Sequence, residues 1–116
     1  MTIEVTQPGI ESEAAVEAEL RDLGLHFLKF EVPAVDNASH WHSFSSVFYV
    51  NEGTLLLTDV ETGQVHHAGP GSRVSVPERT LHAERSDGYS ILLGTSRDPA
   101  TFEDPVNLAA DELVRG

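Results

Sequence analysis

Two histidines separated by one residue, His40 and His42, are the side chains of this sequence best suited to chemistry. On an extended segment, residues two apart point to the same face, with their Cα atoms ~6.6–6.8 Å apart. Two imidazoles that lean from one concave wall can bind a single metal ion through bonds of ~2.0–2.1 Å. The pair therefore predicts two ligands of a metal site, and a third ligand must come from another strand.

His82 is the best candidate for that third ligand. It lies in the segment Thr80–Glu84, where Leu81 and Ala83 alternate with polar residues, a pattern typical of a strand that lines a cavity on one face. Glu84 shares this face, so its carboxylate could orient an imidazole or move a proton, and we take it as the candidate catalytic residue. The same pattern also fits a Glu84 that is merely solvated. It fits histidines that form only structural hydrogen bonds as well.

The residues after His42 extend its face of the strand. By alternation, Phe44, Ser46 and Phe48 point in the same direction as His42. Two phenyl rings and a hydroxyl beside a metal site are typical of the wall of a small pocket, so we predict that these three residues line the substrate site. Filling an apolar core is the more common role of Phe in a strand.

Short strands separated by turns must position these side chains. The pattern of apolar and polar residues predicts strands at 45–50, 54–60, 64–68, 72–76, 80–84 and 89–95. Glycine-bearing turns separate several of them, at 51–53, 69–71 and 86–88. No helical crossover is predicted between the strands, so we expect an all-β, antiparallel sandwich or barrel.

A short helix is expected before the strands. Ser12 fits its N-cap and Gly24 fits its end, which predicts a helix over residues 13–23. Its apolar positions form one narrow stripe: Val16, Leu20 and Leu23.

The chain is predicted to have three parts. They are an N-terminal extension with the short helix (1–24), a barrel (25–95) and a C-terminal tail (96–116). The barrel would begin with a strand at 25–32 that ends at Pro33. In the tail, Asn107 would cap a short helix that runs through Leu113.

Two groups of residues resemble the two motifs of the cupin superfamily. The first motif is a His-x-His pair, a Glu and a Gly, and three of its positions are matched here by His40, His42 and Gly53. The second motif is matched by Gly71, Pro77 and His82. The resemblance covers about Leu25–Thr95 and implies a double-stranded β-helix, or jelly-roll barrel. It also implies that the three histidines hold a metal ion.

Three positions depart from the cupin motifs. Ser46 stands where the superfamily places a metal-binding Glu, Arg79 where it places a Gly, and Ser86 where it places an Asn. Without the carboxylate, three neutral imidazoles would leave a divalent ion with its full charge and an open face. Such a site favours an anionic or bidentate ligand.

The resemblance also suggests a chemistry. Similar three-histidine sites in the superfamily hold Fe(II) in dioxygenases, so we favour Fe(II), with Zn, Ni or Mn as alternatives because imidazole suits several metals. A dioxygenase-type enzyme that acts on a small chelating substrate is the preferred interpretation, with an isomerase or lyase close behind. The alternative is a non-catalytic module that binds a small molecule or carbohydrate, with its metal structural or absent.

Composition excludes several other partners. The 116 residues suit one domain, and the formal net charge of −12 repels phosphate backbones, so we expect no nucleic acid partner. The absence of Cys excludes disulfides and thiolate sites. No run approaches the ~18 apolar residues of a membrane helix, so we expect no membrane partner and a cytoplasmic protein. The helix stripe and the strand at 25–32 exceed what a small barrel needs, which predicts a homodimer formed through the N-terminal segment.

Overall fold

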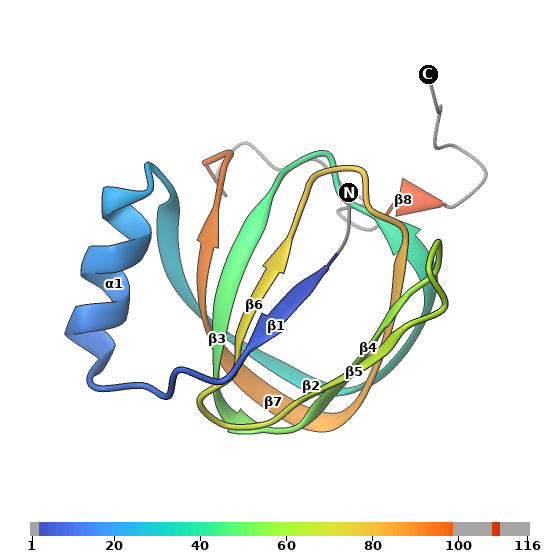
Figure 1. Cartoon of the computed structure of the whole chain (residues 1–116), viewed down its shortest axis with the longest axis horizontal. Helices are drawn as coiled ribbons and strands as arrows, with labels where there is room; N and C mark the ends of the chain where they lie inside the picture. The colour runs from blue at the N-terminus through green and yellow to red at the C-terminus, as the bar shows by residue number, and fades with distance from the viewer. Residues whose placement is uncertain (1–2, 99–107, 110–116) are drawn as a thin grey trace.

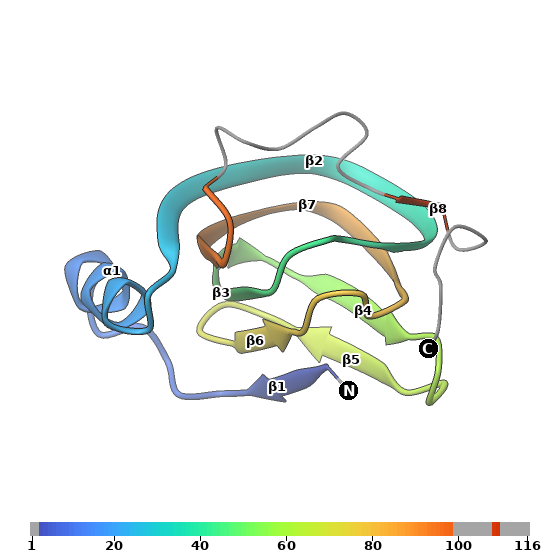
Figure 2. The ribbon, with the colours of Figure 1, turned by 90° about the horizontal axis from the view of Figure 1, so that it is seen from above.

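A single antiparallel sheet that curls around an interior dominates the computed structural model, which describes residues 3–98 and 108–109 (Figures 1 and 2). The described elements are β1 (Glu4–Thr6), α1 (Glu13–Asp22), β2 (His26–Trp41), β3 (Ser46–Gly53), β4 (Leu55–Asp59), β5 (Val65–Ala68), β6 (Arg73–Val76), β7 (His82–Thr95) and β8 (Leu108–Ala109). The sheet order is β1-β6-β3-β7-β2-β8, and β4 joins it by pairing with both β7 and β5. The prediction of an all-β jelly-roll barrel with a short N-terminal helix is confirmed.

β2 and β7 are each longer than predicted and pair along almost their whole length. Their antiparallel register runs from His26 opposite Thr95 to His40 opposite His82. The predicted end of a strand at Pro33 and the predicted break at 86–88 are therefore wrong. Pro33 lies opposite Gly88, which has a positive φ of 132°, so the ladder bends there and continues. One missing N–H does not end a strand at such a bend.

α1 begins and ends close to the predicted residues. The Oγ atom of Ser12 accepts a hydrogen bond of 3.0 Å from the backbone N–H of Ala15, as an N-cap does. Val16 and Leu20 are buried against Tyr49 and Leu92 on the outer face of the sheet. Leu23, the third residue of the predicted stripe, is the C-cap of the helix and is 55% exposed.

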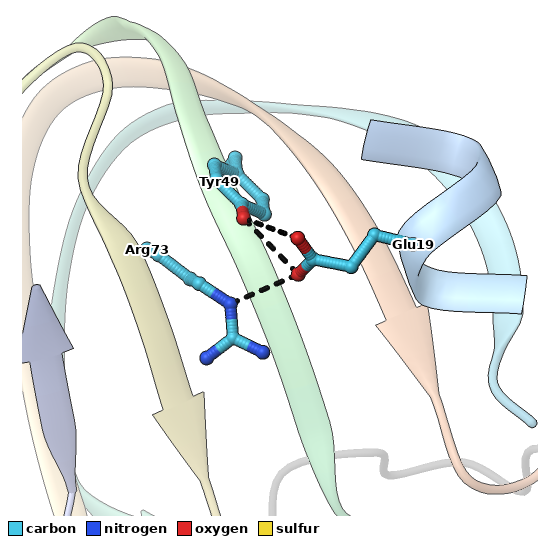
Figure 3. Close-up of polar contacts among 3 residues, drawn as sticks. All are labelled: Glu19, Tyr49 and Arg73. Atoms are coloured by element: carbon cyan, nitrogen blue, oxygen red, sulfur yellow. Dashed lines mark hydrogen bonds and ion pairs between the residues drawn. The ribbon is translucent and has the colours of Figure 1, made fainter. Parts of the chain in front are cut away.

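A polar cluster also fastens α1 to the sheet (Figure 3). The carboxylate of Glu19 accepts hydrogen bonds from the hydroxyl of Tyr49 at 2.9 and 3.0 Å and from Nε of Arg73 at 3.0 Å. Burial and the neighbouring Glu19 carboxylate raise the pKa of Tyr49. The cluster ties the helix to β3 and β6 from outside the barrel, and the inward faces of these strands remain available for the core and the site.

The core fills one part of the barrel interior. Its most deeply buried members come from β3, β4, β5 and β6, together with Ile3 at the start of the described chain: Ile3, Val50, Leu55, Leu57, Ala68 and Val74. The N–H of Ile3 donates to the buried carboxylate of Asp59 at 3.2 Å, which holds the start of the described chain against β4. β1 itself was not predicted, because three residues are too few to show a strand period.

The C-terminal tail differs from its prediction where it is described. Leu108 and Ala109 form β8 and pair with Trp41 and His40, so at these positions the predicted helix is wrong. The rest of that predicted helix lies outside the described residues. α1, the one helix in the described part of the chain, is too short and too polar to cross a membrane.

Candidate metal centre

The three predicted histidines meet at one end of the barrel interior. His40 lies near the end of β2, His42 just after it, and His82 is the first residue of β7, directly opposite His40. Their ring centroids are 4.3 Å apart for His40 and His82, 5.0 Å for His40 and His42, and 5.1 Å for His42 and His82. A bulge in β2 between Asn37 and His40 shifts the register there and brings His40 opposite His82.

The spacing of the ring nitrogens fits a metal site. One nitrogen from each ring lies within 4.8 Å of the others. Bonds of ~2.0–2.1 Å to one ion would draw such nitrogens closer together, which small rotations of the rings could achieve. His40 and His82 are buried and His42 is half-buried, so the centre would face the interior on one side and be reached from the other.

The environment of His82 fixes its tautomer and favours its neutral form. Its Nδ1 lies 2.8 Å from the carbonyl oxygen of Thr80, and because a carbonyl only accepts, Nδ1 must carry the proton. The Nε2 lone pair is then directed away from that bond, as in metal-binding histidines whose other nitrogen is anchored. Burial, above all, lowers the pKa of His82 from 6.5 to about 4. The ring is therefore neutral near pH 7, which is the form that binds metal.

The loop before β7 is fastened to the centre. The backbone N–H of Arg79 donates to the carbonyl of His42 at 2.9 Å. Arg79 has a φ of 62°, the left-handed conformation that a glycine would adopt more cheaply. The turn of the cupin motif is thus kept in spite of the substitution, at the cost of backbone strain.

A pocket of about 450 Å³ adjoins the three histidines. Nine of its fifteen lining residues are apolar: Leu28, Phe30, Val32, Phe44, Phe48, Leu57, Val76, Ile91 and Leu93. The six others are Asn37, His42, Ser46, His82, Glu84 and Tyr89. The structure thus brings the three predicted wall residues and Glu84 to one cavity with two of the histidines. The ring of Phe44 stacks on that of His42, with centroids 5.0 Å apart.

Glu84 is held in a fixed orientation inside this pocket. Its Oε1 accepts a hydrogen bond of 2.8 Å from Nδ2 of Asn37, and its Oε2 accepts one of 2.9 Å from the hydroxyl of Tyr89. Glu84 does not belong to the cluster of nitrogens that could share one ion, but its charge acts on His82. The arrangement places a carboxylate beside the centre without making it a ligand.

Sequence reasoning missed Asn37 and Tyr89, the two partners of Glu84. Asn37 lies directly opposite Glu84 on β2, and Tyr89 follows Glu84 on β7 after the bend at Gly88. Asn37 lies beyond the predicted end of a strand at Pro33, and the predicted break at 86–88 separates Glu84 from Tyr89, so simple alternation could not place the three together. The register of β2 against β7 is the signal that would have found them.

Comparison with known proteins agrees with this fold. A family model described as a cupin domain matches residues 27–92, more than half of the chain. No curated protein matches. A DUF861 family protein from Thermotoga maritima superposes with a TM-score of 0.58 at 15% identity, with 78% of this chain and 96% of that one covered.

Two enzymes share the architecture at low identity. The TDP-quinovose 3,4-ketoisomerase of Campylobacter jejuni superposes with a TM-score of 0.57 at 14% identity and covers 78% of this chain and 75% of its own. A ribosomal oxygenase of Escherichia coli gives a TM-score of 0.57 at 13% identity, over 77% of this chain and 28% of its own. Identities this low indicate the fold alone. The family match, the barrel and the two motifs together show that this chain belongs to the cupin family.

Proposed function

We propose that the chain binds one divalent metal ion through His40, His42 and His82 and acts on a small chelating molecule in the adjoining pocket. The observation that carries this proposal is the convergence of three imidazoles beside a pocket of about 450 Å³. A neutral His82, anchored through Nδ1, supports the same proposal.

Fe(II) is the preferred metal, with Zn, Ni and Mn as alternatives, because imidazole nitrogen binds all of them. When bound, Fe(II) would supply oxygenase chemistry, whereas a redox-silent ion would supply Lewis-acid chemistry for an isomerase or lyase. An oxygenase and an isomerase both occur among the structural neighbours, which illustrates how many reactions this fold supports. A dioxygenase-type reaction therefore remains our proposal rather than a property of the fold.

Other residues of the pocket would bind and orient the substrate. Phe44 and Phe48 would hold an apolar part of the substrate, and Ser46 would occupy the position of the missing ligand without adding charge. Glu84 would face the substrate and accept a hydrogen bond or a proton from it, since both its oxygens are fixed and line the pocket.

The experiment that tests this function measures whether a metal bound at the three histidines can accept a further ligand. The protein is loaded with Co²⁺, whose visible absorption depends on its ligands, and azide or catechol is then added. Three protein ligands leave open positions, so we expect the spectrum to change on addition. His67→Ala serves as the control and should give the same spectral change, because His67 is an exposed histidine on β5 far from the cluster in sequence. No change in the spectrum would show a closed or absent site and would overturn the proposal.

The pocket also supports the alternative of a non-catalytic binding module. Ser46 in place of a carboxylate and the strained Arg79 depart from the metal-binding pattern, whereas the cavity persists. Its mostly apolar walls favour an apolar small molecule over a carbohydrate. Such a module would keep its ligand affinity in His82→Ala, whereas an enzyme of the proposed kind would lose its activity.

A further inference from the structure

Without a bound metal ion, the pocket beside the three histidines is unbalanced in charge. Among the described residues that line it, Glu84 is the one acidic side chain, and no Lys or Arg is present. A carboxylate in a largely apolar cavity is costly unless a partner compensates for its charge. Glu84 is half-buried and supplies the negative charge of this pocket.

The hydrogen bonds of Glu84 fix its position but do not neutralise it. Both donors, Nδ2 of Asn37 at 2.8 Å and the hydroxyl of Tyr89 at 2.9 Å, are neutral groups. Burial and the nearby Glu84 carboxylate raise the pKa of Tyr89, so its hydroxyl keeps its proton and remains a donor. Each carboxylate oxygen accepts one hydrogen bond from these donors and has a second lone pair available for a ligand.

The surroundings of Glu84 also suit a positive group. Four aromatic rings line the same pocket, those of Phe30, Phe44, Phe48 and Tyr89, and the faces of such rings attract cations. The formal net charge of −12 gives the whole molecule a negative potential that concentrates cations and repels anions.

We propose that Glu84, held by Asn37 and Tyr89, binds the ammonium group of a small, otherwise apolar amine. The proposal rests on the proposed function only in taking this pocket as the ligand site, because it does not require a bound metal. It names the class of ligand: a cationic amine, in preference to a neutral alcohol or a carboxylate of the same size.

Three probes with the same phenyl group and different charge test this preference. They are 2-phenylethylamine, which is cationic at neutral pH, 2-phenylethanol, which is neutral, and 3-phenylpropionate, which is anionic. Their binding to the full chain is measured by calorimetry or ligand-observed NMR, with and without a chelator. With the chelator present, we expect the amine to bind at least tenfold more tightly than the alcohol, and the carboxylate to bind most weakly.

Two substitutions separate the charge from the shape of the site. Glu84→Gln keeps the size and an acceptor oxygen, and should reduce the preference for the amine over the alcohol to about twofold or less. Glu31→Gln is the matched control, because Glu31 is an exposed carboxylate on β2 that does not line this pocket. It should keep the full preference. Tyr89→Phe retains the carboxylate charge and should also favour the amine, even if Glu84→Gln fails to fold.

The possible results distinguish this inference from the proposed metal centre. In the presence of the chelator, equal binding of amine and alcohol, tightest binding of the carboxylate, or no binding of any probe at millimolar concentration would overturn the inference. Metal content is measured on the same samples. Selectivity for the amine without bound metal would leave this inference standing and overturn the proposed metal centre. Bound metal without selectivity for the amine would overturn this inference and leave the metal centre standing.

Discussion

His82 shows how one backbone contact can fix the tautomer of a candidate metal ligand. The Thr80 carbonyl accepts the proton of Nδ1, so Nε2 carries the lone pair, and burial keeps the ring neutral. His40 is paired directly opposite His82 across β2 and β7, which places the two side chains on the same face of the sheet. The two histidines are thus positioned by different physical means, and they can be tested separately.

The lowered pKa of His82 predicts how stability depends on pH. Its pKa is about 4 in the folded state and 6.5 in a model peptide, so the unfolded chain binds more protons between these values. The free energy of unfolding of the metal-free protein should therefore fall as the pH falls from 6.5 toward 4. The contribution from this residue is about 2 to 3 kcal/mol.

Urea denaturation at about pH 7 and about pH 4.5 measures this effect. His82→Gln should lose less stability between the two pH values than the unsubstituted protein does, because it lacks the titrating ring. His67→Gln removes an exposed histidine and should behave like the unsubstituted protein. Parallel losses in all three proteins would show that burial does not shift the titration of His82.

At the scale of elements, α1 is attached through one face only. Leu20 is fully buried, whereas Leu23, one turn later, is 55% exposed. Leu20→Ala should lower the free energy of unfolding by about 2 to 5 kcal/mol, because it leaves a cavity between the helix and the sheet. Leu23→Ala should change it by less than about 0.5 kcal/mol. Thermal or urea unfolding compares the two, and equal losses would contradict the described packing.

The turn at the end of β3 depends on a glycine for two reasons. Gly53 has a φ of 83°, and a Cβ added there would overlap the backbone carbonyl oxygen of Gly88. Gly53→Ala should therefore cost about 2 kcal/mol or more, since strained conformation and clash both contribute.

Gly63 provides a matched control for this clash. It has a similar φ of 73°, but an added Cβ would meet nothing within 4 Å. Gly63→Ala should cost only the conformational strain, about 1 kcal/mol. The free energy of unfolding of both variants is measured by urea denaturation. If Gly53→Ala loses no more than Gly63→Ala, the close approach of β3 and β7 at this turn would be refuted.

Elements with a clear local signal could be predicted from the sequence. Ser12 and Gly24 marked α1 well, because capping and positive φ are local requirements. The extents of β2 and β7 could not be predicted, because Pro33 and Gly88 are normally strand breakers and only their mutual pairing lets both strands continue. The network around Glu84 depends on that pairing and was missed for the same reason.

The sequence predicted more of the three-histidine cluster than of the pocket around it. The spacing of His40 and His42 requires only one extended segment, the alternation in Thr80–Glu84 indicated His82, and the motif resemblance supported that choice. The apolar end of the pocket depends on which residues of β2 and β7 face inward, such as Leu28 and Leu93. On β7 the lining residues change from even positions, His82 and Glu84, to odd positions from Tyr89 onward, so alternation counted from His82 could not assign Leu93.

At the scale of the whole molecule, the homodimer remains a prediction. Part of the apolar surface that motivated it, at Val16 and Leu20, is buried within the same chain, whereas Leu23 and Phe30 are exposed. Light scattering at micromolar concentration should give a mass of about twice 12.6 kDa. A monomer mass would contradict the prediction without affecting the metal centre, since the three histidines come from one chain.

The central claim, a metal held by three histidines, is tested most directly by metal content. Mass spectrometry of the untagged protein should find about one iron, nickel, manganese or zinc per chain, and the element would separate oxygen chemistry from redox-silent chemistry. His82→Ala should lose the metal, and His67→Ala should retain it. No stoichiometric metal in the unsubstituted protein, even after reconstitution, or full retention in His82→Ala, would contradict the claim.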